Sequence, residues 1–148
     1  MEIKRAIDQK KPFRNSRHKV IVNLLYSHGW LVTQLRAFFK PFGITEKQYN
    51  ILRILKGAGK PLTTSAIRGR LLDKMSDTTR VIDRMIKKGY VEKKTNETDR
   101  RLVDITLSDN GRALLEKIDN NLQDMDKIIE NLSLEEADKL SELLDQMR

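Results

Sequence analysis

The chain has 148 residues, the usual length of one compact domain, and a formal net charge of +8 from 29 basic and 21 acidic residues. It has no cysteine, which excludes a disulfide framework, a cysteine nucleophile and a thiolate metal site. The sequence contains neither a signal-peptide pattern nor a run of 18 apolar residues, so we expect a cytoplasmic protein without membrane contact.

The charge is unevenly distributed along the chain. Basic residues exceed acidic ones throughout residues 1–104, whereas residues 109–148 carry eleven acidic residues against five basic ones. A basic body favours a polyanionic partner such as nucleic acid, and the acidic end of the chain indicates a separate task.

Two helices are predicted in the first third of the chain. Apolar residues recur with helical period over residues 16–40, which predicts one long amphipathic helix that the sequence KPFGI interrupts. Thr45 and Gln48 then form a capping-box pattern for a second helix, which ends at the glycines of KGAGKP.

A helix-turn-helix is predicted next. The sequence PLTTSAIRGRLL indicates a short extended piece at Leu62, and then a short helix capped by Thr63 or Thr64. After the joint DKMS, a second helix begins near Ser76 and ends at Gly89. The apolar residues expected to face inward from the two helices are Ile67, Leu71, Leu72, Val81, Ile82, Met85 and Ile86.

Beyond Gly89 the apolar period changes from 3.6 to 2 residues. Strands are predicted over residues 90–94 and 102–107, with a polar loop between them. Val103, Ile105 and Leu107 are expected on one face of the second strand. Two strands and a loop directly after a helix-turn-helix make a β-wing, for which Leu62 supplies a plausible third strand.

Two acidic helices complete the chain. Ser108 is the expected cap of a long helix that continues to Leu132, and Ser133 with Glu136 forms a capping-box pattern for a last helix. Both helices carry apolar stripes with nothing comparable to pack on in the central motif. Together with the first helix, we expect them to form the interface of a homodimer.

The predicted fold class is mainly α with a small β-wing (α+β). A winged helix-turn-helix DNA-binding core is flanked by N- and C-terminal dimerisation helices. The expected boundaries within this one interlocked fold are residues 1–44 for the N-terminal arm and long helix, 45–108 for the DNA-binding region, and 109–148 for the C-terminal helices.

The start of the second helix of the helix-turn-helix carries short hydrogen-bonding side chains, as a helix that reads the major groove requires. The candidate DNA-binding residues there are Ser76, Asp77, Thr78 and Thr79, with Arg80 and Arg84 long enough to reach a phosphate or a guanine. A purely structural interpretation has Ser76 and Asp77 as helix caps, and both interpretations can hold together.

The wing loop carries Asp99, Arg100 and Arg101. An arginine at a wing tip can enter the minor groove, and Asp99 can hold such a loop in shape by accepting hydrogen bonds from Arg101 or from turn amides. The alternative is a solvated turn with incidental charges.

Three further residues are candidate contacts with the DNA backbone. Thr64 and Ser65 begin the first helix of the helix-turn-helix, where hydroxyls and amides can bind a phosphate. Lys94, in the first wing strand, can add affinity without sequence preference.

The sequence from Thr79 to Leu115 resembles the signature of the MarR family of bacterial winged-helix transcription regulators. The resemblance rests on the combined spacing of Thr79-Arg80, Asp83-Arg84, Lys88-Gly89, Asp99-Arg100-Arg101 and Leu107-Ser108 with Gly111. It implies a two-fold homodimer on a pseudo-palindromic double-stranded operator. It also implies repression that is relieved by a small molecule bound between the dimerisation and DNA-binding parts.

The same resemblance implies that one wing arginine enters the minor groove while the other pairs with the acid. We assign Arg100 to the DNA and Arg101 to Asp99. Asp77 and the loosely matching segment before Thr79 depart from the family pattern, so base specificity does not follow from the resemblance.

Other functions are less well supported. An enzyme is not expected, because the chain has no glycine-rich phosphate loop and only two histidines, His18 and His28, which lack metal-pair spacing. We therefore expect no cofactor and no metal. A winged-helix module that binds protein or RNA remains the alternative from another class.

Overall fold

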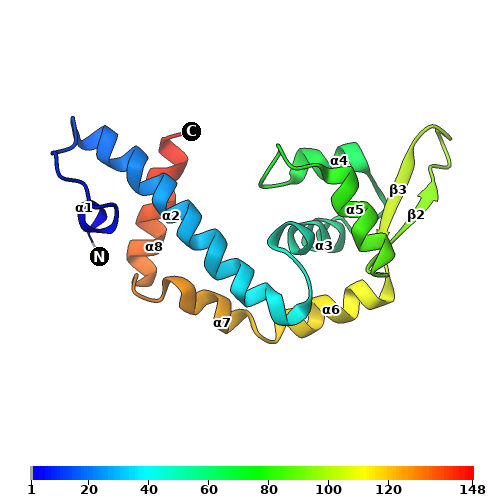
Figure 1. The fold of residues 1–148 in the computed structure, drawn as a ribbon. Helices are drawn as coiled ribbons and strands as arrows, with labels where there is room; N and C mark the ends of the chain where they lie inside the picture. The colour runs from blue at the N-terminus through cyan, green and yellow to red at the C-terminus, as the bar shows by residue number, and fades with distance from the viewer. Residues whose placement is uncertain (1) are drawn as a thin grey trace.

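The structure is a computed structural model that describes residues 2–148, and it is mainly helical (Figure 1). The helical elements are α1 (Ile3–Ala6), α2 (Ser16–Phe39), η1 (Lys40–Phe42), α3 (Glu46–Ala58), α4 (Thr64–Arg70), α5 (Thr78–Lys87), α6 (Asp109–Asp119), α7 (Leu122–Asp126), η2 (Lys127–Ile129) and α8 (Leu134–Gln146). The strands are β1 (Leu62–Thr63), β2 (Val91–Thr95) and β3 (Val103–Leu107).

The strands form one antiparallel sheet in the order β1-β3-β2, so β1 is the third strand expected at Leu62. The register pairs Leu62 with Ile105 and Lys94 with Asp104. The sheet, α3, α4 and α5 form one unit, whereas α8 and most of α2 lie at the other end of the molecule (Figure 1). The predicted class, a winged helix-turn-helix with long flanking helices, is confirmed.

Helix starts follow the expected capping residues. Thr45 Oγ1 accepts the Gln48 N–H at 3.2 Å while Gln48 Oε1 accepts the Thr45 N–H at 3.1 Å, which completes the capping box of α3. Ser133 and Glu136 make the same pair of bonds at α8, at 3.2 and 2.9 Å. Each box satisfies two backbone N–H groups that the helix end would otherwise leave unpaired.

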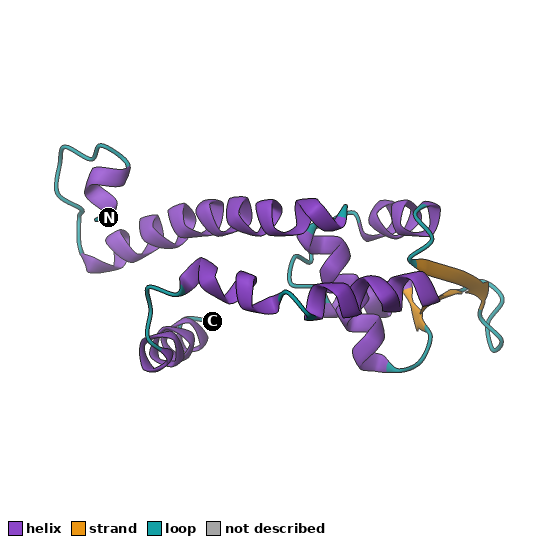
Figure 2. Cartoon of the chain, turned by 90° about the horizontal axis from the view of Figure 1, so that it is seen from below, coloured by secondary structure: helices purple, strands orange, loops and turns teal. Residues whose placement is uncertain are grey.

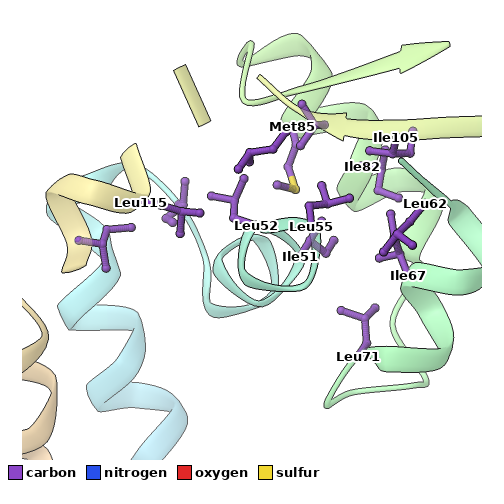
Figure 3. Close-up of a cluster of buried hydrophobic side chains, with 14 of the residues drawn as sticks. Ile51, Leu52, Leu55, Leu62, Ile67, Leu71, Ile82, Met85, Ile105 and Leu115 are labelled. Atoms are coloured by element: carbon purple, nitrogen blue, oxygen red, sulfur yellow. The ribbon is translucent and has the colours of Figure 1, made fainter. Parts of the chain in front are cut away.

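Helix α3 is the centre of the hydrophobic core. Its buried residues Ile51, Leu52 and Leu55 point into a cluster contributed by α4, α5, α6 and the sheet (Figure 3). At the far end of α6, Asp119 forms ion pairs of 2.9 Å with both Arg53 and Lys56 of α3. The unit formed by α3, α4, α5, α6 and the sheet is therefore organised around one helix whose buried residues are fully covered.

The continuous helix predicted from Ser108 to Leu132 is wrong, because the structure breaks it between α6 and α7. At the break, Asn121 has φ −121° and ψ 10°, and its side-chain amide donates to the Lys117 carbonyl at 2.8 Å. Asparagine side chains compete with the backbone in this way and disfavour helix interiors. The break lets α7 turn and pack alongside α2 (Figure 2).

The prediction that Leu72 faces inward is also wrong. Helix α4 ends at Arg70 and Leu71 has an extended backbone, with ψ 143°. The helical period therefore stops one residue before Leu72, whose side chain is 91% exposed.

The wing strands differ slightly from the prediction. The first covers Val91–Thr95, one residue later than expected. Ile105 and Leu107 are buried as predicted, but Val103 on the same face is exposed. This end of the wing extends beyond the helices that cover the rest of the sheet, so alternation along the strand no longer decides burial.

Ser108 joins α5, the β2–β3 wing and α6. Its hydroxyl accepts the Gly111 N–H at 3.0 Å and donates to the Gly89 carbonyl at 2.6 Å, while its own N–H donates to the Tyr90 carbonyl at 3.2 Å. The first turn of α6 lies so close to this backbone that a Cβ on Gly111 would come within 2.2 Å of Tyr90 O. Only glycine fits at position 111.

Gly111→Ala should lower the free energy of unfolding by about 1–3 kcal/mol, because the new methyl group meets backbone rather than a movable side chain. Gly57→Ala is the matched control, since nothing lies within 4 Å of its added Cβ in α3. The control should be neutral or slightly stabilising, because alanine has the higher helix propensity. Urea unfolding of both variants tests this, and equal stabilities would contradict the close approach.

Candidate nucleic-acid interface

Helix α5 is the second helix of the helix-turn-helix, and both of its ends are well defined. Asp77 is its N-cap and accepts the Arg80 N–H at 3.2 Å, so the helix begins at Thr78 rather than near Ser76. At the other end, Gly89 has φ +75°, and the N–H groups of Gly89 and Tyr90 donate to the Ile86 and Met85 carbonyls at 2.9 and 3.0 Å. This Schellman arrangement directs the chain into the wing.

One side of α5 is buried and the other is free. Ile82 and Met85 are buried against the core, and Val81 and Ile86 are half-buried beside them. The exposed residues of the helix and its two caps are Asp77, Thr79, Arg80, Asp83, Arg84, Lys87 and Lys88. The free side is therefore polar and carries more basic than acidic residues.

Thr78 does not lie on that free side. As the first residue of α5 it turns inward, its side chain is 1% exposed, and its hydroxyl donates to the Ser76 carbonyl at 3.4 Å. Unlike the other candidates of α5, Thr78 is therefore not accessible to DNA in this structure. Ser76 is half-buried in the preceding loop, and its hydroxyl donates to the Asp73 carbonyl at 3.1 Å.

The loop between α4 and α5 is attached to α3 by residues that the sequence did not single out. Lys47 Nζ lies 2.7 Å from Asp73 Oδ2, and Asn50 Oδ1 accepts the Leu72 N–H at 3.1 Å. The Lys47 hydrogen bond, helped by the Met75 N–H, holds the pKa of Asp73 below its ordinary value. These contacts attach the loop that precedes α5 to α3.

The start of α4 is close to the prediction. Thr63 is the N-cap, with its hydroxyl accepting the Ala66 N–H at 3.2 Å, and Thr64 and Ser65 form the first turn. Ser65 is exposed and Thr64 half-buried. Of the two candidates, the Ser65 hydroxyl is the more accessible.

The wing loop is held by Asn96, another residue that the sequence analysis missed. Its amide nitrogen donates to both carboxylate oxygens of Asp104 at 3.0 Å, and its amide oxygen accepts the N–H groups of Thr98 and Asp99 at 3.0 and 2.8 Å. Asparagine commonly closes loops in this way, so its position after the first wing strand was an available signal.

Asp99 holds Arg101, as predicted. Its Oδ1 accepts the Arg101 backbone N–H and Nε–H at 3.0 Å each, and its Oδ2 accepts an Nη2–H at 2.9 Å. Arg100 makes no ion pair within residues 2–148 and is exposed, and Lys94 is exposed on β2. The loop thus presents one braced arginine beside one free arginine.

The contact between Asp99 and Arg101, the brace of the wing loop, shifts the pKa values of both side chains. Hydrogen bonds from the Arg101 side chain, and then from its backbone N–H, hold the pKa of Asp99 below 3.8, and the same pair raises the pKa of Arg101. A lowered carboxyl pKa means that the brace is complete above the ordinary pKa and is lost only as the pH falls through the lowered one. The brace is therefore fully formed at neutral pH.

The described residues offer no assembled metal site, since residues 2–148 contain no group of three metal-binding side chains. Within the same range, no helix is both long and apolar enough to cross a membrane. What α4, α5 and the β2–β3 wing do assemble is a basic, hydrogen-bonding surface. These features define a winged helix-turn-helix DNA-binding protein.

Comparison with known proteins identifies the family. The MarR family profile matches residues 44–103. The chain is 30% identical to the multiple antibiotic resistance protein MarR of Salmonella typhimurium over 112 residues, which cover 74% of this chain and 77% of that protein. Identity to the transcriptional regulator PecS of Dickeya dadantii is 29% over 113 residues, covering 74% and 68%. The chain belongs to the MarR family and is a DNA-binding transcriptional regulator, not an enzyme.

Solved structures of related regulators have the same fold as this chain. A mutant MarR from E. coli in complex with operator DNA superposes with a TM-score of 0.76 at 26% identity, covering 84% of this chain and 91% of that one. An organohalide-sensing regulator with bound 2,4-dichlorophenol gives a TM-score of 0.82 over 95% and 86% of the chains. Its identity of 18% supports the fold alone.

Arg101→Ala should raise the pKa of Asp99 toward 3.8, because the largest cause of its depression is removed while the backbone N–H remains. Arg100→Ala is the matched control and should leave that pKa unchanged. Carboxyl titration by NMR measures both. A larger response to Arg100→Ala would show that the two arginines have the opposite roles.

Proposed function

We propose that the protein is a homodimeric repressor that binds a pseudo-palindromic operator and releases it when a small-molecule effector binds. Under this proposal, residues 45–108 contact DNA, and residues 1–44 and 109–148 form the dimer. The observation that carries it is the pairing of an exposed polar face on α5 with a free arginine on a braced wing.

The proposed contacts divide by groove. Thr79, Arg80 and Arg84 face the major groove, which admits an α-helix and displays a distinct donor and acceptor pattern for each base pair. Arg100 enters the minor groove, where the negative potential is strongest at narrow A·T-rich sequence. Asp99 and Arg101 hold the tip in shape, so less conformational entropy is lost on binding.

Backbone contacts fix the register of the protein on the duplex. Ser65 and Lys94 are proposed for phosphates, and Thr64 and Ser76 for further contacts with the DNA backbone. Loss of a lysine contact should weaken binding to all sequences alike.

The proposed dimer rests on apolar surface that a single chain leaves uncovered. Within residues 2–148, α2 buries only Phe39 and α8 buries no residue. The exposed large apolar residues of these two helices are Val20, Ile21, Leu25, Tyr26, Trp30, Leu31, Leu134, Leu140 and Leu143. The two helices lie at the same end of the molecule (Figure 1), and monomeric proteins rarely expose apolar patches of this extent.

A cavity of about 360 Å³ supports the effector part of the proposal. It lies between Arg36 of α2, the first turn of α3, and Arg80 and Arg84 of α5. Basic residues outnumber the two acids of its lining, which favours an anionic or weakly acidic ligand. The 2,4-dichlorophenol of the organohalide-sensing regulator is a ligand of that kind.

Such a ligand would share two arginines with the proposed DNA-binding face. If the ligand binds more tightly to an arrangement of α5 that does not fit the operator, it lowers the affinity of the protein for the operator. By linkage, the operator then lowers the affinity for the ligand by the same factor. Small movements suffice, because two recognition helices must match half-sites one helical turn, about 34 Å, apart.

The test is selection of bound duplexes from a random DNA library at two salt concentrations. An enriched two-fold symmetric sequence with half-site centres about 10 base pairs apart would support the proposal. Binding without sequence preference that disappears at the higher salt concentration would overturn the proposal, because only electrostatic attraction to DNA would then be shown. That result would favour an interaction module for protein or RNA.

Arg100→Ala should weaken operator binding by about 1–3 kcal/mol while the dimer stays intact, because a minor-groove contact is lost. Arg148→Ala removes the same charge at the far end of the chain and is the matched control. Fluorescence anisotropy with the selected operator measures both affinities. Equal losses would assign the effect to net charge rather than to the wing.

Leu140→Asp should raise the dimer dissociation constant by about a hundredfold or more, because it buries a charge in an apolar interface. Gln146→Asp adds the same carboxylate to the polar side of α8 as a control. Sedimentation at micromolar concentration distinguishes monomer from dimer. A fully dimeric Leu140→Asp variant would remove α8 from the interface.

A further inference from the structure

The carboxylate of Asp77 contacts one residue, Arg80, in two ways. Its Oδ1 accepts the Arg80 backbone N–H at 3.2 Å, which caps α5. Its Oδ2 lies 3.1 Å from Nε of the Arg80 side chain. A capping residue needs only the first contact, so the second requires its own explanation.

Arg80 lies opposite the buried stripe of α5, and its side chain is 80% exposed. The ion pair occupies the Nε edge of the guanidinium. The two terminal Nη groups make no hydrogen bond within residues 2–148. Two parallel N–H donors therefore remain at the outer end of a side chain whose inner edge is held.

Guanine presents two acceptors, O6 and N7, at the major-groove edge, and a bidentate arginine is the usual partner for them. A guanidinium held at Nε can make this contact end-on through its Nη groups. We infer that Asp77 is a positioning residue that orients Arg80 to read a guanine in each operator half-site. This inference rests on the operator binding proposed above and assigns one base of the operator to one side chain.

Other pairs on α5 do not offer the same arrangement. Within residues 2–148, Arg84 forms no ion pair with a carboxylate, and Asp83 forms none with a basic side chain. An exposed ion pair contributes little to the stability of the free protein. Its effect belongs to the complex, where a long side chain that is already restrained loses less conformational entropy on binding.

Three simpler roles for Asp77 make different predictions. If Asp77 only caps α5, the Asp77→Asn variant should keep the base preference of the wild type. A charge that repels phosphates would, when removed, strengthen binding to all sequences equally. A direct acceptor for a cytosine amino group would act independently of Arg80.

The experiment is library selection with the full-length protein, followed by affinity measurements on operators that differ at single positions. The variants are Asp77→Asn, Arg80→Lys, their combination, and Asp83→Asn. Asparagine keeps the cap and removes the charge, and Asp83→Asn removes the same charge from the exposed side of the same helix. Thermal unfolding of each variant verifies that the fold is unchanged.

We expect Arg80→Lys to lower the preference for guanine at one position of each half-site by about tenfold or more. Asp77→Asn should lower the preference at that same position by about threefold to tenfold, with unchanged thermal stability. Added to Arg80→Lys, Asp77→Asn should have no further effect on the preference, because it acts through Arg80. Asp83→Asn should leave the preference as in the wild type.

Three results would overturn the inference while leaving the proposed function intact. They are an unchanged guanine preference in Asp77→Asn, a uniform change across all operators, and an additional loss in the double variant. A wild-type protein that selects no sequence would overturn the proposed function itself.

Discussion

The close packing of α6 against the backbone of Tyr90 is the constraint on which the DNA-binding part depends. Ser108 bonds to the end of the recognition helix, to the wing and to the first turn of α6. Gly111 permits the approach because it has no side chain. As a result, α5 and the wing share one anchor, and α6 extends from that anchor toward the helices at the other end of the molecule (Figure 1).

Acidic residues organise the basic surface. Asp99 holds Arg101 at the wing and Asp77 contacts Arg80 at the recognition helix, each within three residues along the chain. The Asp99 pair could be anticipated, because the loop places an acid and two arginines side by side. The role of Asn96 could also have been anticipated from its place after the first wing strand, although the sequence analysis missed it. The Asp77–Arg80 ion pair could not, because it depends on which residue begins α5. Local spacing predicts candidate site residues but not the direction of their side chains.

Much of the fold follows from local signals. Capping residues such as Thr45 and Ser133 place helix starts correctly, because a hydrogen bond between neighbours is enough to define them. The failures occur where tertiary packing or a competing local bond decides. Thr78 carries a polar side chain but turns into the core, Leu72 is apolar but follows the end of its helix, and Asn121 interrupts a stripe that is otherwise periodic. Sequence periodicity identifies a helix more reliably than it identifies where the helix stops.

The uneven burial of α2 means that the molecule has parts of very different local stability. Phe39, at its C-terminal end, is the one buried residue of this 24-residue helix within the described chain. Helices gain most of their stability from packing, so the N-terminal half of α2 in a lone chain should open and exchange its amide hydrogens long before the core around α3 does. A partner surface that covered α2 would therefore also stabilise the helix itself, and the folded fraction of this region would then depend on the concentration of that partner.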